Sequence, residues 1–216
     1  MQCNTPAGVY PGKRMHKAIF FDLGKVLIHF DFRRGYRALE GLCPYAAEEI
    51  PKRLGGSDLV ERFETGLVEP RDFVAQVCAI LDLRADYDQF RQIWSSIFTE
   101  ELIPESMLEG LRRNYNLVLI SNTNALHFEM LSAAYHHLLR HFDHLVLSHE
   151  VRAMKPRPEI FHAALAHAGC HPEECFYTDD IADYVAAARG LGIDGVVFES
   201  RTQIEGEMLR RGIRWE

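Results

Sequence analysis

The chain has 216 residues, of which 47% are hydrophobic and 25% are charged, and this composition, typical of a packed globular protein, excludes general disorder. Acidic side chains outnumber basic ones by 31 to 24, and the net charge of −7 argues against a protein that binds nucleic acid by neutralising phosphates. No apolar run reaches the roughly 18 residues that span a bilayer, and five cysteines without an export signal are typical of reduced thiols. We therefore expect a soluble, cytoplasmic protein with no nucleic-acid or membrane partner; the oligomeric state has no signature in the sequence.

The first part of the chain predicts an extension, a strand and a helical insert. Residues 1–14 hold prolines and glycines but no apolar segment, so we expect a flexible extension, with Met15 as an alternative start. A short apolar run at residues 18–21 predicts a buried strand. From about residue 30 to residue 104 we find no convincing strand, although a crossover needs only roughly a dozen residues. Helical spacing of apolar residues instead predicts a small helical-bundle cap at residues 31–104, whose core includes Phe63, Phe73, Phe90, Trp94 and Phe98.

The rest of the chain repeats one pattern, in which a short apolar run is followed by a stretch with helical spacing. The runs occur at residues 117–120, 145–147, 175–177 and 195–198. Continuous apolarity is typical of strands that are buried on both faces of a parallel sheet. The alternation predicts an α/β fold with a doubly wound, Rossmann-like parallel sheet, formed by residues 15–30 and 105–216.

Polar side chains follow the apolar runs at the ends where ligands bind in such sheets. They are Asp22, Ser121, Asn122, Lys155, Asp179 and Asp180. Paired carboxylates suit Mg²⁺, which offsets the charge of a phosphate so that a carboxylate can attack it. A lysine and hydroxyl or amide donors stabilise the phosphate oxygens. The set indicates phosphoryl transfer, with a small-molecule phosphate ester as the partner.

Four of these stretches follow one another in the order and rough spacing of the motifs of the haloacid dehalogenase (HAD) superfamily. They are Phe21-Asp22-Leu23-Gly24, Ser121-Asn122, Lys155-Pro156 and Asp179-Asp180. From Lys17 onward the chain resembles that superfamily, in particular members with a helical cap after the first strand.

The resemblance implies a role for each matching residue. Asp22 would be the nucleophile and a Mg²⁺ ligand, and Ser121 and Asn122 would bind phosphate. Lys155 would balance charge and contact the phosphate. Asp180, with Asp179 beside or behind it, would complete the metal site.

Two positions depart from the pattern of the family's phosphatases. Gly24 stands where these enzymes usually carry the aspartate that protonates the leaving group; its backbone carbonyl would still bind Mg²⁺, but the lost proton transfer would cost about 10²- to 10⁴-fold in rate. Tyr184 stands four residues after the metal-binding Asp180, where Asn or Asp is common, and Asp183 is a partial substitute.

The substrate prediction rests on the same departure. Asp-Leu-Gly-x-Val followed by Asp31 and Arg34 is similar to bacterial HAD phosphatases that act on glucose 1-phosphate, and the Asp-Asp-Ile segment to the phosphatase domain of epoxide hydrolases. Without a positioned acid, leaving groups more acidic than an ordinary alcohol are favoured, which makes a sugar 1-phosphate our first expectation. Asp31 and Arg34 would contact substrate or form a solvated charge pair.

Other functions stay open at this stage. Gly24 and Tyr184 fit a binding or regulatory protein with little turnover. A 2-haloacid dehalogenase would leave the acidic pair unexplained, and a phosphomutase needs the missing acid.

Three further patterns have structural explanations. Gly190-x-Gly192-x-x-Gly195 follows a helix and precedes a strand, the reverse of a dinucleotide site. The cysteines and histidines at 167–175 suit a turn better than a zinc site, and the histidines at 136–144 suit a polar helix face.

Overall fold

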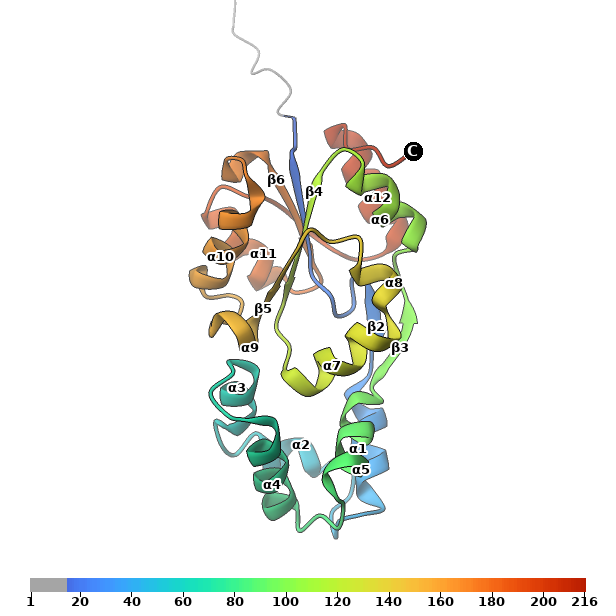
Figure 1. Cartoon of the computed structure of the whole chain (residues 1–216), viewed down its shortest axis with the longest axis vertical. Helices are drawn as coiled ribbons and strands as arrows, with labels where there is room; N and C mark the ends of the chain where they lie inside the picture. Colours follow the sequence, from blue (N-terminus) through green and yellow to red (C-terminus); the bar gives the residue numbers. More distant parts are fainter. Residues whose placement is uncertain (1–14) are drawn as a thin grey trace, which may run out of the picture.

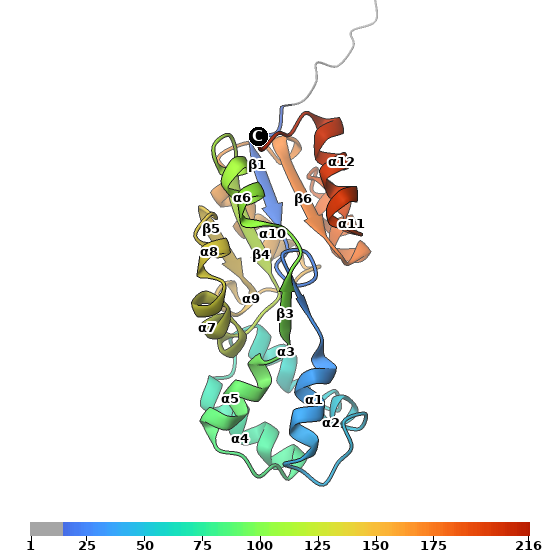
Figure 2. The same ribbon diagram turned by 90° about the vertical axis from the view of Figure 1, so that its right-hand side faces the viewer.

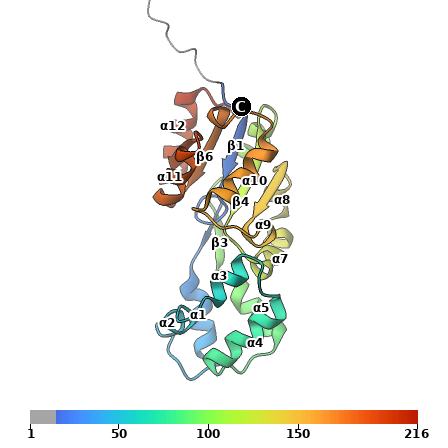
Figure 3. The same cartoon turned by 90° about the vertical axis from the view of Figure 1, so that its left-hand side faces the viewer.

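An α/β core and a helical insert lie end to end in the computed structural model, which describes residues 15–216 (Figure 1). The two views turned by 90° from Figure 1 show the core at one end and the insert at the other, joined through a narrow pair of strands (Figures 2 and 3). The extension predicted at residues 1–14 lies outside the described residues.

The core is built on a five-stranded parallel sheet with the strand order β5-β4-β1-β6-β7. The strands are β1 (Ala18–Phe21), β4 (Asn116–Ser121), β5 (His144–Leu147), β6 (Cys175–Asp179) and β7 (Asp194–Val197). The predicted α/β, doubly wound, Rossmann-like parallel sheet is therefore confirmed, and each predicted run overlaps a strand of this sheet.

Helices cover both faces of the sheet, which Figure 1 shows nearly edge-on. One face carries α10 (Pro158–Ala168) and α11 (Ala182–Gly190), beside the short α9 (Ser148–Val151) and a 3₁₀ turn at Pro172–Glu174. The other carries α6 (Glu105–Arg112), α7 (Ala125–Ala134), α8 (His136–Leu139) and α12 (Arg201–Arg211). Among the described residues, none of the helices combines the length and the apolar character needed to cross a membrane.

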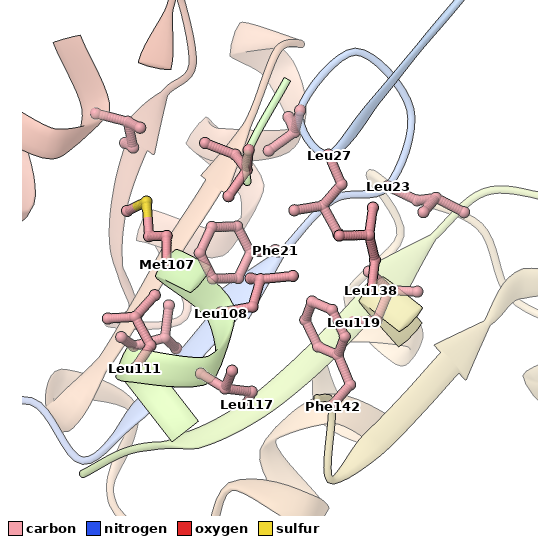
Figure 4. Close-up of a cluster of buried hydrophobic side chains, with 14 of the residues drawn as sticks. Phe21, Leu23, Leu27, Met107, Leu108, Leu111, Leu117, Leu119, Leu138 and Phe142 are labelled. Carbon is pink, nitrogen blue, oxygen red and sulfur yellow. The ribbon is translucent and has the colours of Figure 1, made fainter. Parts of the chain in front are cut away.

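Alternate residues of β1 enter different halves of the core, as expected for a strand covered on both sides. Phe21 packs with Met107 and Leu108 of α6 (Figure 4), while Phe20 belongs to the cluster that contains Phe161 of α10. Every residue of β1 is fully buried. Burial of this kind stabilises the fold by about 25 cal/mol per Å² of apolar surface and anchors the residue that follows the strand.

The insert contains five helices within the described chain: α1 (Phe32–Glu40), α2 (Ile50–Leu54), α3 (Leu59–Glu64), α4 (Pro70–Leu81) and α5 (Tyr87–Ser95). Four aromatic rings hold them together: Phe63 stacks on Phe73 at 3.9 Å, and Trp94 lies 5.3 Å from Phe73 and 5.4 Å from Phe90. Leu126 of α7 joins the same buried cluster and ties the insert to the core.

The expectation that residues 30–104 contain no strand is wrong at one place. β3 (Phe98–Glu101) pairs antiparallel with β2 (Ile28–Phe30), and this pair carries the chain out to the insert and back. β3 is short and mostly exposed, so its sequence lacks a buried pattern, and its pairing with a segment about 70 residues away is a tertiary event. Phe98 accordingly packs at this ribbon and not in the middle of the bundle.

Candidate active site

The polar residues that follow the strands meet at one edge of the sheet. Asp22 lies directly after β1, and its backbone N–H donates to the carbonyl of Thr178 in β6, which ties the two strand ends together. Lys155 lies in the loop before α10, with its Nζ 2.5 Å from Asp22 Oδ1 and 2.7 Å from Asp179 Oδ2. Residues separated by 133 positions in the chain thus form one cluster.

All three ammonium protons of Lys155 have acceptors. The third proton is donated to the backbone carbonyl of Ile120 at 3.0 Å, and Lys155 as a whole residue is 3% exposed. Burial alone would lower the pKa of Lys155, but the carboxyl groups of Asp22 and Asp179 raise it, so the ammonium stays charged. The sequence predicts that the Lys155 ammonium contacts a phosphate. For this contact the ammonium must exchange one of its three hydrogen bonds for a bond to a phosphate oxygen.

Asp179 is held from three sides and faces away from solvent. Its carboxylate accepts hydrogen bonds from Lys155, from the hydroxyl of Tyr177 and from the backbone N–H of Ile181. Sequence reasoning missed Tyr177, although a signal was present: it precedes Asp179 by two residues in a strand, so both point to the same face, and a buried Tyr needs a partner for its hydroxyl. Asp179 therefore lies behind the site and orients Lys155.

Three carboxyl groups cluster at this edge of the sheet. Oxygen atoms of Asp22, Asp179 and Asp180 lie within 4.8 Å of one another, the only such cluster of His, Cys, Asp or Glu found in residues 15–216. Burial raises the pKa of Asp22 to about 7, with Asp179 adding to the shift and Lys155 opposing it; burial also raises that of Asp180. Hard oxygen donors whose charges repel one another fit a divalent cation such as Mg²⁺.

The side-chain amide of Asn122, which we predicted to bind phosphate, contacts Lys155 and Tyr184 in this structure. Its side-chain Oδ1 accepts from the backbone N–H of Lys155 at 2.8 Å, and its Nδ2 donates to the Lys155 carbonyl at 3.0 Å and to the Tyr184 hydroxyl at 3.4 Å. With both ends of the amide occupied, only the backbone of Asn122 remains for a phosphate. Tyr184 also places its ring 5.2 Å from the Lys155 ammonium, whereas Asp183 is exposed and outside the carboxylate cluster.

A cavity of about 50 Å³ opens beside this cluster, between the core and the insert. Its lining includes the buried Ser121, as the predicted phosphate role requires, and Asn122 and Gly24 from the core. From the insert and its ribbon come Phe30 and Glu64. Two of the three predicted phosphate-binding residues, Ser121 and Asn122, therefore line a cavity whose wall the insert shares, whereas Lys155 is not part of its lining.

Phe30 occupies the space in front of Gly24. A Cβ atom built on Gly24 would lie 2.5 Å from Cε1 of the Phe30 ring, closer than van der Waals contact allows. The ring is itself packed edge-on against Phe32 and Phe98, at 5.0 and 6.1 Å between centroids. The packing of the Phe30 ring thus suits a glycine at position 24, which has no Cβ atom.

Two predicted substrate residues have local partners instead. Asp31 caps α1 by accepting from the backbone N–H of Arg33, and it also accepts from the Arg33 side chain at 3.1 Å. Arg34 donates to the carbonyl of Ser96. Neither residue lines the cavity, and these contacts account for both side chains without a substrate.

Sequence reasoning also missed His127, which joins the core to the insert. This histidine, 5% exposed, interacts with Asn124 through Nδ1 and with the Trp94 carbonyl through Nε2, and it stacks on the Trp94 ring at 5.6 Å. Burial lowers its pKa to about 4, so the imidazole is neutral near pH 7. A lone histidine in a helix gives no signal of this kind in a sequence.

The chain is similar to several known proteins. A family model described as haloacid dehalogenase-like hydrolase matches residues 16–192. A D-ribitol-5-phosphate phosphatase from Bacteroides thetaiotaomicron is 25% identical over 186 residues, covering 83% of this chain and 90% of the relative. A protein from Mycobacterium tuberculosis named as a phosphatase is 27% identical over 207 residues, covering 89% and 92%. A solved HAD-family enzyme from B. thetaiotaomicron, in complex with magnesium and inorganic phosphate, superposes with a TM-score of 0.75 at 27% identity, covering 86% of this chain and 96% of that one.

Proposed function

The chain belongs to the haloacid dehalogenase-like hydrolase family and is a phosphatase, and we propose that it hydrolyses a small phosphorylated metabolite with Mg²⁺ through a phospho-Asp22 intermediate. The observation that carries this proposal is the meeting of Asp22, Lys155 and Asp180 at one strand edge, beside a cavity lined by Ser121.

Each residue of the site has a distinct role in the proposed reaction. An Asp22 carboxylate oxygen attacks the phosphorus, and the bond to the leaving oxygen breaks. The Lys155 ammonium offsets the charge of the carboxylates, and the Ser121 hydroxyl donates to a phosphate oxygen. Water then attacks the phosphorus of phospho-Asp22, which releases inorganic phosphate and restores the carboxylate.

The carboxyl groups of Asp22 and Asp180 and the backbone carbonyl of Gly24 would hold the metal ion. When bound, Mg²⁺ neutralises phosphate charge and polarises the phosphoryl group. Asp179 stays behind this set because its oxygens are engaged by Lys155, Tyr177 and the Ile181 N–H.

For the substrate, we propose a phosphorylated sugar or sugar alcohol. Gly24 removes one source of the leaving-group proton, which favours the anomeric oxygen of a sugar 1-phosphate. The relative named D-ribitol-5-phosphate phosphatase supports the broader class of polyhydroxylated phosphates.

The purified full chain, assayed with glucose 1-phosphate, ribitol 5-phosphate, glycerol phosphate and 4-nitrophenyl phosphate, tests the proposal. We expect phosphate release that needs Mg²⁺, stops with EDTA, and is lost in Asp22→Asn, whose amide still accepts from Lys155 and so preserves packing. Absence of turnover on the whole panel, with retained binding of inorganic phosphate, would instead support the binding or regulatory function.

The close fit of the Phe30 ring over Gly24 is the observation that favours this second function, because it removes room for the usual acid. A dehalogenase is supported less, since halide displacement gives no role to the carboxylate cluster. Chloride release from chloroacetate is the measurement that would favour it.

A further inference from the structure

The site as described lacks a group that protonates the leaving oxygen. Gly24 has no side chain, and the Phe30 ring leaves no room for one. A proton donor must therefore come from another part of the cavity wall if alkyl phosphates are to be cleaved at a useful rate.

Glu64 is the carboxylic acid in the lining of this cavity. It is the last residue of α3, in the insert, and it is partly buried. Ser121, Asn122 and the backbone at Gly24 line the same cavity, so Glu64 shares this space with the residues predicted to bind the phosphate.

The position of α3 against the core is closely defined. Gly66 follows the helix with a φ of +67°, and its α-carbon packs so closely on the carbonyl of His149 in α9 that a Cβ atom would overlap it. Arg157, in the loop after Lys155, donates to Glu61 on the same helix at 3.3 Å. These contacts fix the helix that carries Glu64 into the lining of the cavity.

We infer that Glu64 is the general acid and base of this enzyme, supplied by the insert in place of the missing side chain at position 24. This inference rests on the proposed phosphatase activity. As Asp22 attacks, the phosphorus–oxygen bond to the leaving group breaks, and the leaving oxygen takes the Glu64 proton. In the second step the attacking water gives a proton to Glu64, which returns the carboxyl group to its starting form, while the bond between phosphorus and Asp22 breaks.

The surroundings of Glu64 suit this role. Burial, with a smaller contribution from the Glu61 carboxylate, raises the pKa of Glu64 to about 7. Two other ionisable groups lie near it: Tyr36 of α1, whose pKa the Glu64 carboxylate helps to raise, and His127 of α7, which lines the same cavity. Burial lowers the pKa of His127 to about 4, so this histidine carries no positive charge that would favour the carboxylate. An acid that is half protonated near pH 7 can serve both steps.

Glu64→Gln, compared on two leaving groups, tests the inference. With glycerol phosphate, an alkyl ester, we expect turnover to fall about 10²- to 10⁴-fold, because the alkoxide leaves without a proton. With 4-nitrophenyl phosphate, whose leaving group is acidic, the first step is spared, and we expect a burst of nitrophenolate followed by slow release of phosphate. The fall in alkyl phosphate turnover above about pH 7 should vanish in Glu64→Gln and persist, at reduced rate, in Glu64→Asp.

The controls separate the possible failures. Glu69→Gln changes an exposed carboxylate of the insert that makes no cap hydrogen bond, and it should behave as the unaltered enzyme. A first-turnover loss of nitrophenolate formation that equals the loss with glycerol phosphate, or no loss on either substrate, would overturn the role of Glu64. Turnover that disappears in Asp22→Asn would still keep the phosphatase. If the unaltered enzyme hydrolyses neither substrate, both proposals fall. Circular dichroism of each variant excludes unfolding as the cause of a loss.

Discussion

The side-chain amide of Asn122 holds the backbone of Lys155 at both of its polar groups, accepting from the N–H at 2.8 Å and donating to the carbonyl at 3.0 Å. The loop that carries the lysine is therefore fixed to the end of β4, where Ser121 also lies. This bond pair explains how an ammonium group 33 residues away reaches the carboxylates with little freedom.

Asn122→Ala should misplace Lys155 without removing it. We expect turnover to fall roughly 10- to 100-fold, since a shift of about 1 Å in a catalytic group costs that much. Inhibition by inorganic phosphate should change little, because the amide is occupied by the lysine backbone. A loss of phosphate inhibition that matches the loss of turnover would show that the amide contacts phosphate after all.

Gly24→Asp should fail to restore the acid of the family pattern. The new side chain would collide with the Phe30 ring, and we expect a loss of about 1–3 kcal/mol in unfolding free energy with no gain in turnover. In a Phe30→Ala background the same change should cost less, which a double-mutant cycle in urea measures. Equal costs in both backgrounds would refute the collision.

Gly66→Ala should disturb the contact between the insert and the core. An alanine at φ +67° costs about 1–2 kcal/mol, and its Cβ would overlap the His149 carbonyl, a backbone group that cannot rotate away. We expect lower stability together with reduced turnover, because α3 must shift and carries Glu64 with it. Gly41→Ala, at a negative φ with open space around it, is the matched control and should leave both quantities nearly unchanged.

Protonation of His127 should destabilise the protein in mild acid. The pKa of His127 is about 4 in the folded protein, whereas that of an ordinary histidine is 6.5. Between these two pH values the unfolded chain therefore binds more protons than the folded chain. The stabilisation is complete above about pH 6.5 and is lost as the pH falls toward 4, with a total of about 3 kcal/mol.

Urea unfolding of the unaltered chain and of His127→Gln at pH 7 and pH 4 checks this. We expect the variant to be less stable at pH 7, because the hydrogen bond to the Trp94 carbonyl weakens. The difference in unfolding free energy between the two proteins should narrow by about 3 kcal/mol at pH 4. His162→Gln, at an exposed position, serves as the control. A difference in unfolding free energy that stays constant with pH would show that His127 ionises like an ordinary histidine.

The sequence by itself determined the sheet and the residues gathered at its edge. Continuous apolar runs that are followed by Asp22, Ser121 or Asp179 have one economical arrangement, because parallel strands buried on both faces bring their carboxyl ends to the same edge. The apolar runs and the polar residues that follow them were enough to predict this part of the structure.

Only the tertiary structure decided how the insert meets that edge. Three features join segments whose sequences do not predict one another. They are the pairing of β2 with β3, the Phe30 ring over Gly24, and the cavity that Glu64 and Ser121 both line. The same holds for Asn122, whose side chain is of a type that binds phosphate but is taken up by Lys155. Residue type sets what a side chain can bind, whereas packing between distant segments sets which partner it finds.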